Sequence, residues 1–158
     1  MFRGSSFLLQ KSAKHFQTTI EYIATLDKSV WDIDVDNYDK KNIHAIIKIY
    51  DDIKALLIHK ENRHLTLITK IQLGIFGFIP AFDKNFCKTF RDISNGKCVF
   101  RNVNEESLTL IKTFYESNKL SIDTLAKDSF TTEFLTGQKT KICYSKAKII
   151  DLYGFSFQ

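Results

Sequence analysis

Residues 66–83 read TLITKIQLGIFGFIPAFD, and this stretch decides the fold that the sequence predicts. Its first half has apolar residues at helical spacing. Gly74 and Gly77 then follow, and a glycine at a helix terminus can adopt a positive φ without a Cβ clash. Pro80 suits the first turn of a second helix, because a residue at that position needs no N–H group. The stretch therefore predicts two helices joined by a short glycine-containing hairpin.

Helical patterns continue on both sides of this hairpin. Apolar residues recur every three or four positions, which places them on one face of an α-helix. The pattern predicts helices over residues 5–26, 40–58, 65–73, 80–93, 104–119 and 144–155. A further helix is expected to begin at Ser121, residues 27–39 are expected to form a loop, and 129–141 stay unassigned. We expect a mainly α fold: a single-domain bundle of about six helices over residues 1–158.

The composition is that of a globular protein. The chain has 158 residues, of which 44% are hydrophobic and 26% are charged, and this balance argues against disorder. No run of about 18 uncharged apolar residues occurs, so neither a membrane span nor a membrane partner is predicted. Cys87, Cys98 and Cys143 are odd in number and lack C-x-x-C spacing, which argues against a disulfide framework. A reduced, cytoplasmic protein is expected.

The charge balance permits an anionic partner. Lys and Arg number 23 against 18 Asp and Glu, a formal net charge of +5. A positive potential attracts phosphates, although a charge of this size also serves solubility alone. Lys84, Lys88 and Arg91 step by four and three, so they share one face of the helix predicted over 80–93. The opposite, buried face is expected to carry Phe82, Phe86 and Phe90.

Neither a metal site nor a cofactor site is predicted. Asp32, Asp34 and Asp36 alternate like the start of a calcium-binding loop, which needs a bidentate Glu at its twelfth position. Ile43 stands at that position and cannot bind a metal. The acidic residues are therefore expected to form a solvated loop that precedes a helix.

The sequence leaves open whether the protein is an enzyme. It contains neither a G-x-S-x-G turn nor a G-x-x-x-x-G-K-[ST] phosphate loop. Lys70 and Asp83, on either side of the hairpin, form the one pair of residues that we would test for catalysis.

Two stretches of the sequence carry resemblances to known families. The string T-L-I-T-K-x-x-L-G-x-x-G-x-x-P-A-x-D, with Arg3-Gly4 before it and residues 148–153 after it, resembles a family of uncharacterised bacterial proteins without an assigned activity. More distantly, residues 65–93 resemble the helix-hairpin-helix region of DNA-glycosylase-like folds, in which P-x-x-D follows a helix that carries a lysine. The chain lacks the L-P-G-V-G hairpin of those enzymes, so the resemblance implies contact with a nucleic-acid backbone rather than base excision.

Two functions follow as hypotheses. The first is a nucleic-acid-binding module in which the hairpin presents backbone N–H groups to phosphates. Its contact residues would be Lys70, Gly74, Gly77, Lys84, Lys88 and Arg91. The second is a module without catalysis that binds a partner protein or a second copy of itself. In that case the glycines only allow two helices to pack closely.

Overall fold

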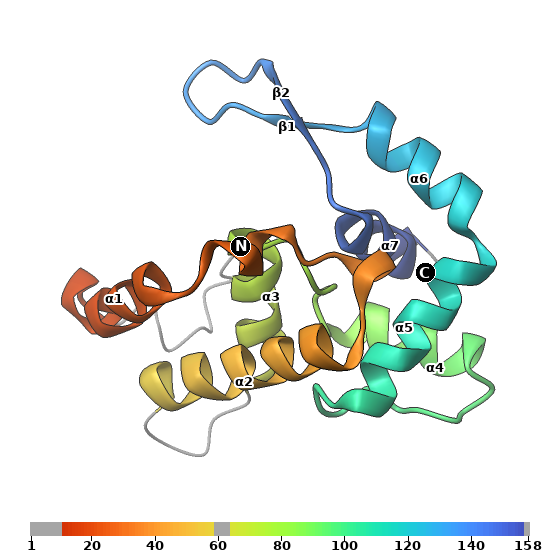
Figure 1. The fold of residues 1–158 in the computed structure, drawn as a ribbon, viewed down its shortest axis with the longest axis horizontal. Coiled ribbons are helices and arrows are strands. Elements are labelled where there is room, and N and C mark those ends of the chain that lie inside the picture. Colours follow the sequence, from red (N-terminus) through yellow and green to blue (C-terminus); the bar gives the residue numbers. More distant parts are fainter. Residues whose placement is uncertain (1–10, 59–63, 157–158) are drawn as a thin grey trace.

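The computed structural model describes residues 11–58 and 64–156, and this part of the chain is mainly helical (Figure 1). The predicted fold class is thereby confirmed. The helices are α1 Gln17–Thr25, α2 Lys40–Leu57, α3 Leu65–Ile75, α4 Lys84–Ile93, α5 Glu105–Ser117, α6 Lys119–Asp128 and α7 Lys146–Ser156. Short 3₁₀ turns cover Ala13–Phe16, Lys28–Asp32 and Val35–Asn37. The strands are β1 Phe130–Thr132 and β2 Lys139–Cys143.

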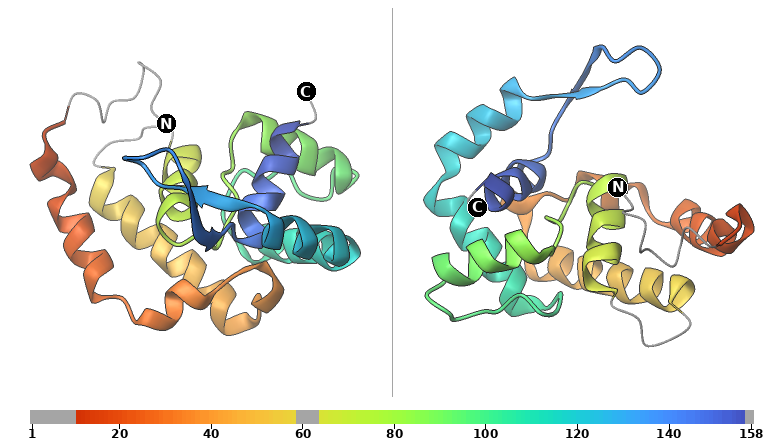
Figure 2. Two further views of the ribbon diagram at one scale, coloured as in Figure 1. Left: turned by 90° about the horizontal axis from the view of Figure 1, so that it is seen from above. Right: turned by 180° about the vertical axis from the view of Figure 1, so that it is seen from behind.

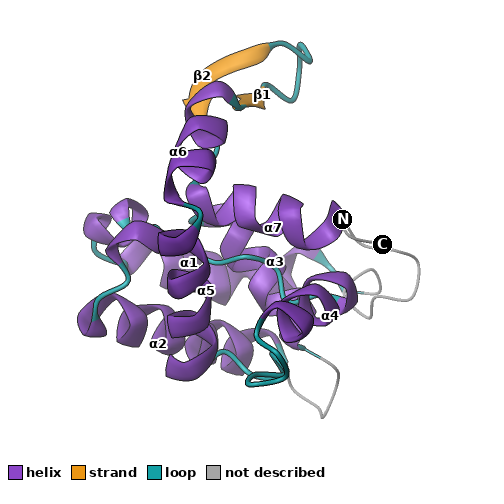
Figure 3. Cartoon of the chain, turned by 90° about the vertical axis from the view of Figure 1, so that its right-hand side faces the viewer, coloured by secondary structure: helices purple, strands orange, loops and turns teal. Residues whose placement is uncertain are grey.

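A two-stranded hairpin stands off the helical body. Strands β1 and β2 pair antiparallel, with Phe130 opposite Cys143 and Thr132 opposite Lys139. Helix α6 leads from α5 to this hairpin, which projects at one end of the molecule (Figures 1 and 3). We call residues 130–143 the arm. The sequence left this stretch unassigned, because its strands are short and mostly exposed and therefore lack an apolar alternation.

The helix predicted over 80–93 begins later than expected. Helix α4 starts at Lys84, and Asp83 is its N-cap rather than a residue of its first turn. Pro80 is buried in the connecting segment instead of starting the helix. Residues 78–82 are all buried, and five consecutive residues point to every side of a helix, so a single helix face could not bury them together.

Other helix ends also differ from the sequence prediction. Helix α3 runs to Ile75, two residues beyond its predicted end at residue 73, so Gly74 lies inside the helix. Of the helix predicted over 5–26, residues 5–10 lie outside the described part, and the remainder forms a 3₁₀ turn followed by α1. Helices α2, α5 and α7 lie within two residues of their predicted bounds.

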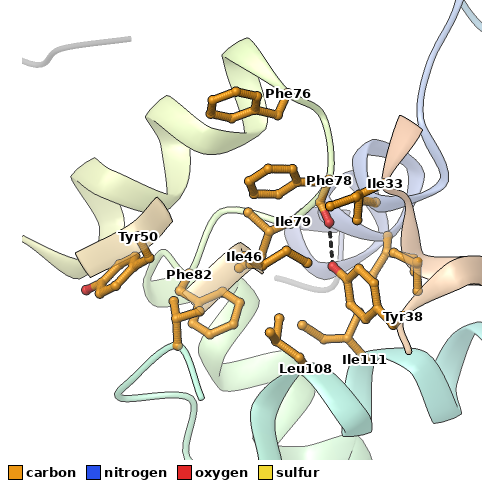
Figure 4. Close-up of a cluster of buried hydrophobic side chains, with 14 of the residues drawn as sticks. Ile33, Tyr38, Ile46, Tyr50, Phe76, Phe78, Ile79, Phe82, Leu108 and Ile111 are labelled. Carbon is orange, nitrogen blue, oxygen red and sulfur yellow. Dashed lines mark hydrogen bonds between the residues drawn. The ribbon is translucent and has the colours of Figure 1, made fainter. Parts of the chain in front are cut away.

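Phenylalanines form the centre of the core. Phe82, Phe86 and Phe90 expose 1–2% of their surface, which confirms the predicted buried stripe. Their rings stack in sequence, with centroids 5.4 Å apart for the first pair and 4.3 Å apart for the second. The buried Tyr38 hydroxyl donates a hydrogen bond to the carbonyl oxygen of Phe78, so a polar group of this core has its partner (Figure 4).

The acidic residues that alternate like a calcium loop anchor the start of α7. The Asp34 carboxylate accepts hydrogen bonds from the backbone N–H groups of Lys146, at 2.7 Å, and Ala147, at 3.0 Å. It also accepts the N–H of Val35, and Lys146 Nζ lies 2.9 Å from a carboxylate oxygen of Asp36. Burial raises the pKa of Asp34, while these hydrogen bonds act in the opposite direction. A residue 112 positions away thus caps α7.

Helix α7 in turn holds the segment between α3 and α4. Ser145 Oγ donates to the carbonyl oxygen of Gly77 at 2.6 Å, and Asp151 Oδ1 accepts the N–H of Ala81 at 3.0 Å. Gly154 packs against α4 so closely that a Cβ atom there would lie 2.6 Å from Phe86 Cδ2. Helix α7 therefore fixes the geometry of the segment between α3 and α4.

Replacing Asp34 by Ala is expected to destabilise the fold. The substitution leaves three backbone N–H groups without their carboxylate acceptor, which costs about 1–3 kcal/mol of unfolding free energy. Asp36→Ala is the matched control: it removes a partly exposed ion pair and should cost less than about 1 kcal/mol. Urea unfolding of the two variants and the wild type measures both changes. Equal losses for the two variants would show that Asp34 does not anchor α7.

Candidate functional site

A cleft of about 1050 Å³ opens where α3, α7, the connecting segment and the base of the arm meet. The predicted residues Lys70, Gly74 and Gly77 all line it. Asp83 lines it as well, followed by Lys148 and Asp151 from α7. The cleft therefore brings the central string of the sequence together with the segment 148–153 near its end.

Four charged groups lie in this cleft as two ion pairs. Lys70 Nζ is 3.7 Å from Asp83 Oδ2, so the structure brings together the one pair of residues that we would test for catalysis. Lys148 Nζ is 2.8 Å from Asp151 Oδ2. The two lysines are about one third exposed. Each positive charge has a negative neighbour, so these four groups do not form a positive groove.

The walls of the cleft are apolar and open to solvent. Large side chains from separate segments line it while they expose 42–67% of their surface: Trp31, Ile75, Ile142, Leu152 and Phe155. The sequence analysis missed these residues as a group. Each belongs to a different short stretch or to the outer side of a helix, so no periodic signal joins them.

Backbone donors at the start of α4 and in the segment before it have carboxylate partners within the protein. Asp83 Oδ1 accepts the N–H groups of Asn85, at 3.1 Å, and Phe86, at 3.0 Å, at the start of α4. Asp151 accepts the N–H of Ala81. A helix N-terminus binds phosphate through free N–H groups, and here carboxylates take that place. This geometry fits a packing corner, and the assignment of Lys70, Gly74 and Gly77 to nucleic acid stays a prediction.

The three basic residues predicted on α4 lie outside the cleft and share an exposed face. Lys84, Lys88 and Arg91 are all exposed, and Arg91 Nε lies 3.5 Å from a carboxylate oxygen of Asp92. The loop that follows the Asn95-Gly96 turn adds two exposed basic residues that the sequence analysis did not include. We call this set the basic surface: Lys84, Lys88, Arg91, Lys97 and Arg101.

Positive charge is concentrated along the basic surface. Residues 84–101 contain five basic residues and a single acidic one, Asp92. The signal was present in the sequence, because Lys97 and Arg101 follow the Asn95-Gly96 turn shortly after α4. The helical-face argument could not include them, since they lie beyond the last helical residue, Ile93.

No protein-family model, curated protein or solved structure matches the chain. The resemblances to an uncharacterised bacterial family and to the helix-hairpin-helix region therefore stay predictions. Within residues 11–58 and 64–156, no group of three or more His, Cys, Asp or Glu side chains is placed to hold a metal ion. Among the helices of these same ranges, none combines the length and the apolar character needed to cross a bilayer.

Gly77→Val is expected to cost more stability than Gly96→Val. Both glycines have positive φ, +74° and +75°, so valine is strained at either position by about 1–3 kcal/mol. A Cβ at position 77 would also meet Ser145 Oγ at 3.1 Å, whereas nothing lies within 4 Å at position 96. Overpacking adds about 1 kcal/mol or more at Gly77. Chemical unfolding measures the difference, and an equal cost at both positions would show that the contact with Ser145 is unimportant.

Proposed function

We propose that the protein binds nucleic acid through the basic surface of α4 and the loop after it. The observation that carries the proposal is the concentration of exposed positive charge there, with Asp92 as the single acidic residue between positions 84 and 101. Lysine and arginine side chains bind phosphates by charge and release counterions, which gives affinity without sequence specificity. A net charge of +5 for the whole chain acts in the same direction.

The packing of α4 supports a binding role for these side chains. The helix is held from its other face, where Phe86 and Phe90 are buried and the Thr89 hydroxyl donates to the carbonyl oxygen of Gly154 at 3.0 Å. Its N-terminus is capped by Asp83. The fold of α4 therefore does not depend on the basic residues, and like charges on adjacent turns repel slightly.

Replacing Lys84, Lys88 and Arg91 by Gln tests the proposal. Unfolding free energy should change by less than about 0.5 kcal/mol, because the three side chains are exposed. Affinity for a nucleic-acid duplex should fall, and the slope of log K against log salt should flatten by about one for each phosphate that the variant no longer neutralises. Electrophoretic shift or anisotropy at several salt concentrations measures this slope.

The matched control removes three other exposed lysines. The control variant carries Gln at positions 28, 40 and 41, so it has the same net charge as the test variant. Its changes lie elsewhere: Lys28 is on the first 3₁₀ turn after α1, and Lys40 and Lys41 are at the start of α2. The control should keep most of the affinity. An equal loss in both variants would mean that only total charge matters, and unfolding of the test variant would make its basic residues structural.

The cleft supports a second candidate function, the binding of a partner protein or of a second copy of the chain. Its exposed apolar walls are the observation that favours this function. Cys143 lines the cleft and is exposed, whereas Cys98 is buried and burial raises the pKa of Cys87 to about 11. Only the thiolate reacts, so Cys143 should react first with a maleimide.

Labelling of Cys143 therefore reports on occupation of the cleft. If the chain associates with itself through this surface, labelling should slow as protein concentration rises, together with a dimer in sedimentation. The Leu152→Glu variant, which places a charge on the cleft wall, should restore fast labelling and a monomer. If a dimer forms but Cys143 is still labelled quickly, the interface of the dimer lies elsewhere.

A further inference from the structure

The tip of the arm exposes two adjacent large apolar side chains. Phe134 exposes 98% of its surface and Leu135 exposes 88%. They lie between β1 and β2, in the turn that Gly137 closes by donating its N–H to the carbonyl oxygen of Glu133 at 2.9 Å. Figures 1 and 3 show this turn as the part of the arm farthest from the helices. Such exposure contributes nothing to folding, so the tip is available for a partner.

The small size of the tip favours insertion of its two side chains into a binding partner over a flat protein–protein interface. A stable protein–protein interface covers about 800 Å² on each partner, far more than two side chains at a turn can offer. Some DNA-binding proteins instead use a wedge, an apolar side chain that enters between two stacked base pairs. A wedge needs only one or two such side chains. Phenylalanine and leucine are among the residue types that proteins use in this way.

The strand behind the tip carries positive charge along one face. Lys139 and Lys141 are both exposed and lie two positions apart on β2, so their side chains leave the same face of the strand. Thr140, between them, points to the other face, where its hydroxyl bonds to that of Thr131. The arm therefore combines an apolar tip with cations on its side, a combination that suits the stacked bases and phosphates of a duplex.

We propose that the arm is a wedge that inserts Phe134 and Leu135 between base pairs of duplex DNA, while Lys139 and Lys141 contact its phosphates. This inference rests on the proposed function and extends it to a substrate class, a duplex that can be kinked. Helix α7 lies between α4 and the arm in Figures 1 and 2. Helix α7 packs against the face of α4 opposite the basic residues, so a duplex that contacts both the basic surface and the arm has to bend, and a kink at the wedge allows this.

The experiment uses the full chain and a duplex of about 30 base pairs with a donor and an acceptor dye at its ends, long enough for a kink to change the end-to-end distance. A second duplex carries one central mismatch, which lowers the cost of unstacking. The test variant is Phe134→Ala with Leu135→Ala. The control is Ile20→Ala with Leu120→Ala, which removes two exposed apolar side chains from α1 and α6.

Wild type and control should raise energy transfer between the dyes and should bind the mismatched duplex about tenfold more tightly than the intact one. The test variant should unfold at the same urea concentration as wild type, because the two side chains that it truncates are exposed. It should abolish the change in energy transfer and the preference for the mismatch, while the intact basic surface keeps the affinity for the intact duplex within about tenfold.

Four results would overturn the inference. If wild type binds the duplex without bending it, or if the test variant bends it equally well, the arm is not a wedge and the proposed function stands without it. If the test variant instead turns a dimer into a monomer, the tip is a protein interface. If wild type binds neither duplex at any salt concentration, the proposed function itself fails.

Discussion

The docking of α7 by two partly buried carboxylates is the interaction on which the rest of the structure depends. Asp34 accepts the first N–H groups of α7, and Asp151 of α7 accepts the N–H of Ala81 in the segment between α3 and α4. Each contact joins residues 70 or more positions apart. Buried N–H groups require an acceptor, so these two aspartates fix the position of the last helix against the middle of the chain.

The cleft and the basic surface differ in chemistry because aspartates neutralise the lysines of the cleft. Asp83 accepts backbone N–H groups of α4, and Asp151 accepts that of Ala81. The two aspartates also pair with Lys70 and Lys148, which leaves the cleft balanced in charge and apolar at its walls. Farther along α4 and in the loop after it, five basic residues stand against a single acidic residue, Asp92. A phosphate therefore finds more favourable potential at the basic surface than in the cleft, although both adjoin the same hairpin.

The sequence predicted features that depend on local spacing. The burial of Phe86 and Phe90 and the exposure of the basic face both follow from a period of 3.6 residues within α4, whereas Phe82 is buried in the non-helical segment before it. The sequence could not predict contacts between residues that lie far apart along the chain. The alternating aspartates gave no sign that Asp34 would cap a helix 112 positions away, and the start of α4 depended on burial of the segment before it. The cleft walls come from separate stretches, so only the fold assembles them.

Lysine footprinting of the protein with and without bound duplex tests the central claim most directly, because it locates the contact rather than only detecting it. The modification rate of each lysine by an amine reagent is measured at low salt. If the basic surface binds phosphates, Lys84, Lys88 and Lys97 should be protected by the duplex, while Lys28, Lys40 and Lys41 should keep their rates. Uniform protection of all these lysines, or protection of the second group alone, would contradict the account.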